Sequence, residues 1–189
     1  MLNLVWVKIG WKRINFFKTT KMENLPYFEL ITSQDLKEYY VIEIDLNGRK
    51  TSIDLNFKNN SITKDGIETI KAFLDDINKF DKQNKSYISN DFTEGNGETK
   101  DYINFYFDEL DQDEISNIID IHDVSTPKEI LLLNKLKLNR IGLYPDGKYN
   151  TDYYAVFDYS IDINGKSCEQ LLVIKTNEKG QLDHIAWES

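Results

Sequence analysis

The sequence predicts an α+β domain, and the period of its apolar residues is the main reason. Apolar and polar residues alternate from 38 to 57 and again from 137 to 187, which is typical of strands. Between these runs, from 63 to 133, apolar residues recur every three or four positions, which is typical of helices. We therefore expect an N-terminal hairpin, a helical middle and a C-terminal antiparallel meander, with the helices on one face of the sheet.

The N-terminal hairpin is predicted by residues 38–57. Tyr40, Ile42, Ile44 and Leu46 alternate with polar residues, and the alternation returns at 53, 55 and 57. The dipeptide at 47–48 is Asn-Gly, which accepts the positive φ angles that a tight hairpin turn requires. This segment therefore forms two antiparallel strands.

The helical middle contains three predicted segments. The first has apolar residues from 67 to 80 at helical spacing and begins at Thr63 or Asp65, after which a polar stretch leads to a loop at 94–97. Residues 98–110 fit a strand as well as a helix, and we favour the helix because the same period continues from Asp113. Pro127 suits the first turn of a short helix over 130–133.

The meander consists of four strands joined by short turns. They cover 137–144, 154–163, 171–175 and 182–187, and the turns between them contain Pro145-Asp146-Gly147, Asn164-Gly165 and Glu178-Lys179-Gly180. Glycine and asparagine in such turns are typical of antiparallel neighbours.

Charge divides the chain at Met22. Residues 1–21 carry five bases and no acids, whereas residues 22–189 carry 18 bases against 32 acids, a formal charge of −14. The leader has its apolar residues before its bases, which is the reverse of a secretory signal, and its apolar run is too short to span a bilayer. It is an amphipathic helix on an anionic membrane surface, an element packed on the domain, or an extension upstream of a start at Met22. We expect residues 22–189 to form a single acidic domain.

No catalytic signature is present in the sequence. The two histidines, His122 and His184, lie in different predicted elements, and the acidic run from 108 lacks the glycine and glutamate of a calcium loop. Phosphate-binding loops and a nucleophile elbow are also absent. We expect no catalytic residue, no metal and no cofactor. Cys168 is the single cysteine, so no internal disulfide forms, which agrees with a cytoplasmic location.

The excess of acids favours a protein partner with a basic surface. Backbone phosphates repel such a domain, so nucleic acid is not an expected partner, whereas an acidic surface accelerates association with a basic protein. Eight acids lie between 94 and 114, and two tyrosines lie among them. A solvated helix face is the alternative interpretation of this run. The predicted partner-binding residues are Tyr102, Tyr106, Asp108, Glu109, Asp111, Asp113 and Glu114.

Several segments resemble a family of small bacterial proteins of unknown function. These are LPYFELI, YYVIEIDLNGRKTSIDLNF, RIGLYPDGK, YAVFDYSIDI and LLVIKTNEKGQLDHIAWES. The resemblance covers about residues 25–189 and transfers no catalytic residue. Small acidic proteins of this kind are often immunity proteins, which block a toxin by covering its active or substrate surface. The alternatives are a small hydrolase that uses carboxylates near His122 or His184, and a regulatory module that self-associates through the edge of the meander.

Overall fold

The computed structural model describes residues 22–189 of the chain, and the predicted leader, residues 1–21, lies outside the described residues. The strands are β1 (Met22–Asn24), β2 (Leu30–Thr32), β3 (Tyr39–Leu46), β4 (Arg49–Asn56), β5 (Lys137–Leu143), β6 (Ala155–Ser160), β7 (Asp162–Ile163), β8 (Lys166–Ser167), β9 (Leu171–Thr176) and β10 (Leu182–Glu188). The helices are α1 (Lys64–Asp75), α2 (Ile77–Glu94), α3 (Glu98–Glu109), α4 (Gln112–Ile118), α5 (Lys128–Leu133) and the 3₁₀ turn η1 (Lys148–Asn150).

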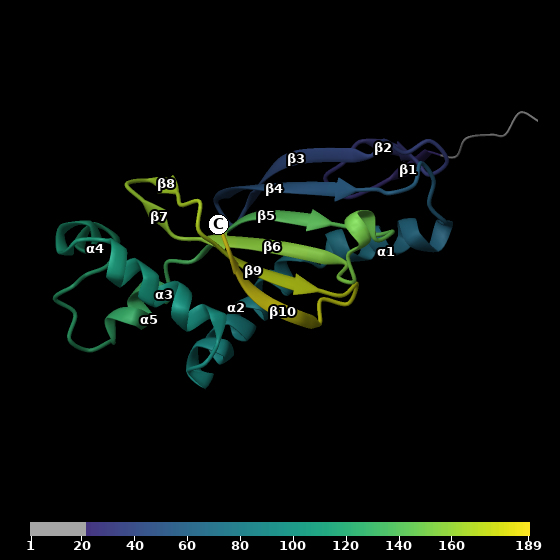
Figure 1. Ribbon diagram of the computed structural model, residues 1–189. Helices are drawn as coiled ribbons and strands as arrows, with labels where there is room; N and C mark the ends of the chain where they lie inside the picture. Colours follow the sequence, from purple (N-terminus) through teal and green to yellow (C-terminus); the bar gives the residue numbers. More distant parts are fainter. Residues whose placement is uncertain (1–21) are drawn as a thin grey trace, which may run out of the picture.

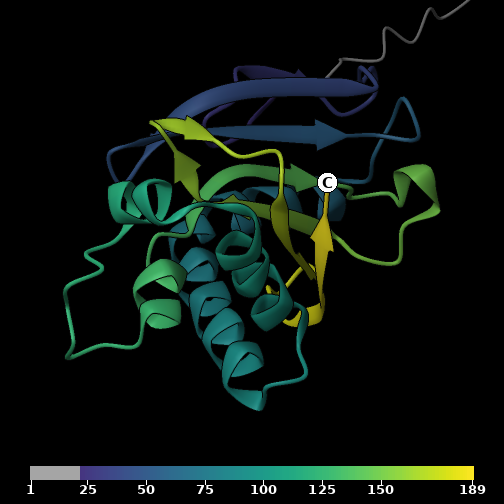
Figure 2. The ribbon, with the colours of Figure 1, turned by 60° about the vertical axis from the view of Figure 1, so that its left-hand side comes forward.

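Six strands form one mixed sheet in the order β10-β9-β6-β5-β4-β3. The predicted hairpin is β3–β4 with its turn at Asn47-Gly48, and the predicted meander is β5-β6-β9-β10. The two halves join where β4 and β5 pair in parallel, with Ile53 opposite Ile141. A parallel connection needs a long crossover, and the helical middle supplies it. The helices gather on one side of this sheet (Figures 1 and 2), which confirms the predicted fold class.

The helix-facing side of the sheet forms the core. Buried residues on β4, β5, β6 and β9 alternate with residues that point away from the helices, as a pleated strand requires. On the helices, the spacing of three and four places the apolar side chains on the stripe that meets the sheet. The buried residues of this interface include Ile53, Leu55, Ile141, Leu143, Phe157, Tyr159, Leu172, Ile174, Ile67, Ile70, Phe73, Leu74, Ile77 and Phe80. We call the side of the sheet that faces away from the helices the open face.

Helix α1 begins where the sequence predicts. The side-chain oxygen of Thr63 accepts a hydrogen bond from the Gly66 backbone N–H, so Thr63 rather than Asp65 is the N-cap. The predicted first helix is, however, two helices, because α1 ends at Asp75 and α2 begins at Ile77. The backbone N–H of Asp76 closes α1 by donating to the carbonyls of Ala72 and Phe73.

The polar stretch after residue 80, for which the sequence predicts no helix or strand, is helical. Helix α2 continues to Glu94 and ends at Gly95, which has a φ of +81°. The apolar period fails in this helix because two of its buried positions are occupied by Asp81 and Asn84. The prediction of a helix over 98–110 is confirmed by α3.

The second strand of the meander is shorter than predicted. It ends at Ser160, and the chain then forms β7–β8, a separate small hairpin around Asn164-Gly165. Asn164 and Gly165 both have positive φ angles, as the turn requires.

Candidate functional site

An arginine at the centre of the open face joins three strands. Arg140 on β5 lies opposite Asp158 on β6, and Asp54 is on the neighbouring strand β4. The guanidinium donates from Nε and Nη2 to the two oxygens of Asp54 at 2.6 and 2.9 Å, and from Nη1 to Asp158 at 2.9 Å. Nη2 also donates to the hydroxyl of Tyr144 at 3.1 Å. Such charge-assisted, bidentate bonds fix the guanidinium in one orientation.

Gly142 makes room for this arrangement. A Cβ atom at position 142 would lie 2.5 Å from Nη2 of Arg140 and 3.2 Å from a carboxylate oxygen of Asp54. The guanidinium therefore lies flat over the backbone of β5 at the one residue of the strand that has no side chain. This explains why a glycine stands in the middle of an otherwise well-filled strand.

Burial controls the charges of this cluster. Burial opposes the positive charge of Arg140, but the hydrogen bond and charge of Asp54, together with Tyr144 and Asp158, outweigh this effect, and the pKa of Arg140 is raised. Burial also raises the pKa of Asp158, although the nearby Arg140 counteracts part of this rise. One arginine thus compensates two buried carboxylates, and the cluster carries a net negative charge when both are ionised.

Four tyrosines surround Arg140 on the open face, and we call Tyr39, Tyr144, Tyr149 and Tyr153 the tyrosine surface. The ring of Tyr144 lies edge-on to the rings of Tyr149 and Tyr153, with centroids 6.2 and 5.6 Å apart. Partial burial and the charge of Asp54 raise the pKa of Tyr39, so this tyrosine is within electrostatic reach of the cluster. Tyr149 is 71% exposed and Tyr39 is 50% exposed, which leaves their rings available for contact.

The loop that presents Tyr149 is firmly held. Asp146 accepts hydrogen bonds from the backbone N–H groups of Lys58 and Asn59 at 2.8–2.9 Å. The ammonium group of Lys148 donates to the carbonyl of Glu38 at 2.9 Å and lies 5.4 Å from the centre of the Tyr149 ring. Tyr149 itself has a φ of +62°, an unfavourable angle for a bulky residue. Backbone strain of this kind occurs often at functional sites.

The structure contradicts the prediction that Tyr102 and Tyr106 are surface anchors. Both tyrosines of α3 are 0% exposed. The hydroxyl of Tyr102 donates to the carbonyl of Gln170 at 3.1 Å, and the two hydroxyls lie 2.9 Å apart. The ring of Tyr102 packs edge-on against Trp187 on β10 and against the ring of Tyr106, because the helical spacing that places the two tyrosines together also directs them into the core.

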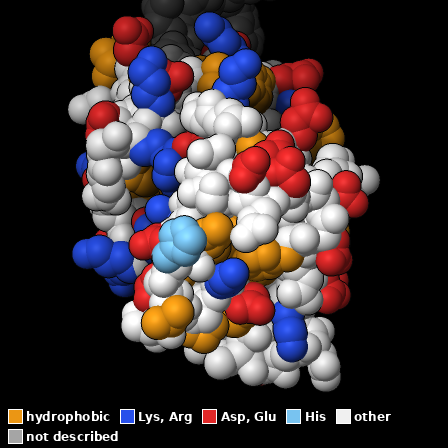
Figure 3. All heavy atoms as spheres, turned by 90° about the vertical axis from the view of Figure 1, so that its left-hand side faces the viewer, with side chains coloured by type: hydrophobic (Ala, Val, Ile, Leu, Met, Phe, Trp, Pro, Cys, Tyr) orange, Lys and Arg blue, Asp and Glu red, His pale blue; other side chains and the backbone are white. Residues whose placement is uncertain are grey.

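The predicted acidic residues lie on the surface of α3 and α4, but two of them have a structural role. Asp111 and Glu114 form a capping box, in which each carboxylate accepts a hydrogen bond from the other residue's backbone N–H. Asp108, Glu109 and Asp113 are exposed. Figure 3 shows this end of the molecule, where acidic side chains lie mainly along one margin and basic ones along the opposite margin. Figure 1 places α4 and the turn at 148–150 at opposite ends, so these acids do not surround the tyrosine surface.

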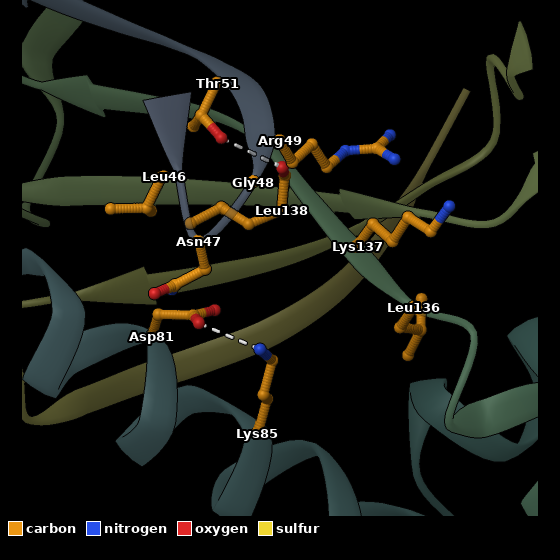
Figure 4. A pocket seen from close by; sticks show the side chains of 10 residues that line it. All are labelled: Leu46, Asn47, Gly48, Arg49, Thr51, Asp81, Lys85, Leu136, Lys137 and Leu138. Carbon is orange, nitrogen blue, oxygen red and sulfur yellow. Dashed lines mark hydrogen bonds and ion pairs between the residues drawn. The ribbon is translucent and has the colours of Figure 1, made fainter. Parts of the chain in front are cut away.

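A cavity of about 320 Å³ lies between the β3–β4 turn, α2 and the start of β5 (Figure 4). Its one carboxylate belongs to Asp81, which is buried and accepts bonds from Lys85 at 2.8 Å and from the Tyr159 hydroxyl at 2.9 Å. Arg49 and Lys137, which also line the cavity, both bind Asp162. Each charged side chain that lines the cavity is therefore engaged in an ion pair, Lys85 with Asp81, and Arg49 and Lys137 with Asp162 beside the cavity.

The two histidines do not form a catalytic arrangement within residues 22–189. His122 and His184 are both exposed, and the ring of His184 contacts a single carboxylate, that of Asp183, at 2.6 Å. In the same part of the chain, no group of three or more His, Cys, Asp or Glu side chains is placed to hold a metal ion. No helix of the described residues is long and apolar enough to cross a membrane.

Arg140 and the tyrosine surface are absent from the sequence-based site prediction. One signal was present, since arginine occurs only three times in a chain rich in lysine, and Arg140 interrupts an alternating strand two residues before a glycine. The partners of Arg140 are 18 and 86 residues away, so only the sheet brings them together. Comparison with family models, curated proteins and solved structures gives no match, and the resemblance to the bacterial family stays a prediction.

Proposed function

We propose that this chain is a non-catalytic protein-binding domain whose tyrosine surface docks a basic protein. In its most specific form, the proposal is that of an immunity protein which covers the active or substrate surface of a toxin. The observation that carries the proposal is Tyr149, an aromatic side chain exposed by a strained backbone on a firmly held loop. Exposed aromatic rings on rigid supports are typical anchors of protein interfaces.

The charge of the domain supports a basic partner. Residues 22–189 have a formal charge of −14. The carboxylates of Glu38, Glu43 and Glu188, on or directly before strands of the open face, are exposed, and each pairs with a lysine. A field of this sign accelerates the approach of a basic protein, while the tyrosines supply the contacts that hold it. The mechanism requires complementarity and no chemical step.

The test compares two tyrosines. A partner is recovered with the full chain from the native cell, identified by mass spectrometry and purified, and its affinity is measured by calorimetry. We expect Tyr149→Ala to weaken binding at least tenfold, as the loss of an interface anchor does. Tyr87→Ala, on the helix side of the molecule, is the control and should bind as the parent chain does.

The immunity form of the proposal has its own readout. Expression of the partner alone should stop growth, co-expression with this chain should restore it, and Tyr149→Ala should fail to do so at equal abundance. If Tyr149→Ala binds the partner with the same affinity as the parent chain, the tyrosine surface is not the binding surface. A harmless partner would remove the immunity role and leave the binding role.

A further inference from the structure

The edge strand β3 has free backbone groups along its outer side. It ends the six-stranded sheet, so only its inner side is paired, with β4. Leu46 and Arg49 flank the two-residue turn, which makes them a hydrogen-bonded pair, and such pairs alternate along the hairpin. The backbone groups of Val41, Glu43 and Asp45 therefore point outward. Within residues 22–189, no backbone hydrogen bond reaches these three residues from outside the hairpin.

A groove runs beside the first half of this strand. Two adjoining cavities of about 290 and 340 Å³ separate β3 from the segment at 28–32, and both are lined by Phe28, Glu29, Lys37 and Tyr40. Because the two cavities share these four residues, we treat them together and call them the edge groove.

Exposed apolar side chains are concentrated around the edge groove. Leu30 on β2 is 56% exposed and Val41 on β3 is 55% exposed, whereas large apolar side chains of a folded domain are mostly covered. A groove that combines apolar walls with a row of unpaired backbone groups fits an extended peptide chain.

The two faces of β3 specify the chemistry of such a chain. On the open face, Glu43 and Asp45 follow Val41, and on the helix side Ile42 and Ile44 are half-buried. A strand added to this edge places alternate side chains next to these two rows. Basic residues opposite the carboxylates and aliphatic residues opposite the isoleucines would complement both rows.

We propose that β3 binds an extended segment of a partner protein in which basic and aliphatic residues alternate, and that this segment extends the sheet by one strand. This inference rests on the proposed function, because it assigns the way in which a basic partner is held. It adds a second contact area next to the tyrosine surface. This area would recognise both the backbone and the alternating side chains of the partner segment.

The test uses a synthetic peptide of four lysine–valine repeats that carries a dye at one end. The backbone nitrogen of each valine is methylated. The lysine N–H groups then remain free to pair with β3, and the outer edge of the peptide is blocked against self-association. Fluorescence anisotropy with the full chain should show saturable binding. Moving the N-methyl groups to the lysines, or replacing lysine by glutamate, should weaken binding roughly tenfold or more.

A substitution on β3 separates backbone pairing from folding. Val41→Pro removes one outward N–H and leaves the bonds to β4 intact, as proline does on the free side of an edge strand. We expect Val41→Pro to weaken peptide binding about tenfold and Val41→Ala, which loses part of the apolar wall but keeps the N–H, to weaken it clearly less, with circular dichroism unchanged in both.

Three outcomes would overturn the inference. If the peptide fails to bind while the partner still depends on Tyr149, the proposed function stands without the edge. Equal binding by Val41→Pro would show that charge alone attracts the peptide. A dimer in sedimentation experiments that Val41→Pro converts to monomer, together with no peptide binding, would assign the edge to a second copy of the chain.

Discussion

Replacing Arg140 by methionine tests whether the cluster on the open face is held together as described. The variant removes the only cation among residues 22–189 that contacts Asp54 and Asp158, whose side chains are 1% and 10% exposed. Leaving a buried carboxylate without its partner costs about 3–5 kcal/mol. Because a third of the Arg140 side chain is exposed, we expect the lower end, about 3 kcal/mol of unfolding free energy at pH 7.

The loss should depend on pH in a defined direction. Burial already raises the pKa of Asp158, and Arg140 counteracts part of this rise, so without Arg140 the pKa of Asp158 in the folded state should lie still further above its unfolded value of about 3.9. The folded variant then binds protons more tightly than the unfolded chain does, so its stability falls as the pH rises through the raised pKa. The difference between parent and variant should therefore be largest at pH 7 and shrink towards pH 4.

The assay is urea unfolding followed by circular dichroism at pH 4, 5.5 and 7. The control is Lys50→Met, since the pair between Lys50 and Glu43 has a similar distance, 2.8 Å, but both side chains are exposed. An exposed pair contributes at most about 1 kcal/mol, so this variant should stay close to the parent. A loss below about 1 kcal/mol for Arg140→Met, or a loss equal at all three pH values, would refute the reasoning.

Two further predictions concern titration. Burial raises the pKa of four tyrosines, which should remain neutral in the folded chain above pH 10 while their unfolded forms ionise, so stability should fall as the pH rises past 10. Absorbance at high pH should show these four ionising only with unfolding; they are Tyr102, Tyr106, Tyr154 and Tyr159. Separately, the hydrogen bond from Arg49 lowers the pKa of Asp162, so this carboxylate stabilises the fold above about pH 3.9 and its contribution is lost as the pH falls through the lowered pKa. Asp162→Asn should cost about 1–2 kcal/mol at pH 7 by urea unfolding and much less at pH 2; an equal cost at both would contradict this.

Much of the local structure follows from the sequence because its signals act over a few residues. The Asn47-Gly48 turn, the start of α1 at Thr63 and the four strands of the meander each depend on neighbouring residues. The full length of α2 was not predicted, because the local pattern of apolar residues is interrupted within it. Its helical period is broken by Asp81 and Asn84, and the packing of α2 against the sheet gives Asp81 a buried hydrogen-bond donor, the hydroxyl of Tyr159.

The sequence by itself determined the class of the fold and the acidic character of the domain, since periodicity and charge are properties of the chain. Only the tertiary structure decided which aromatic residues are exposed. Tyr102 and Tyr149 both stand beside charged residues in the sequence, yet the first is fully buried and the second is 71% exposed. The physical reason is that exposure depends on what packs against a side chain. The Arg140 cluster likewise exists only because the parallel pairing of β4 with β5 brings Asp54 next to a residue 86 positions away.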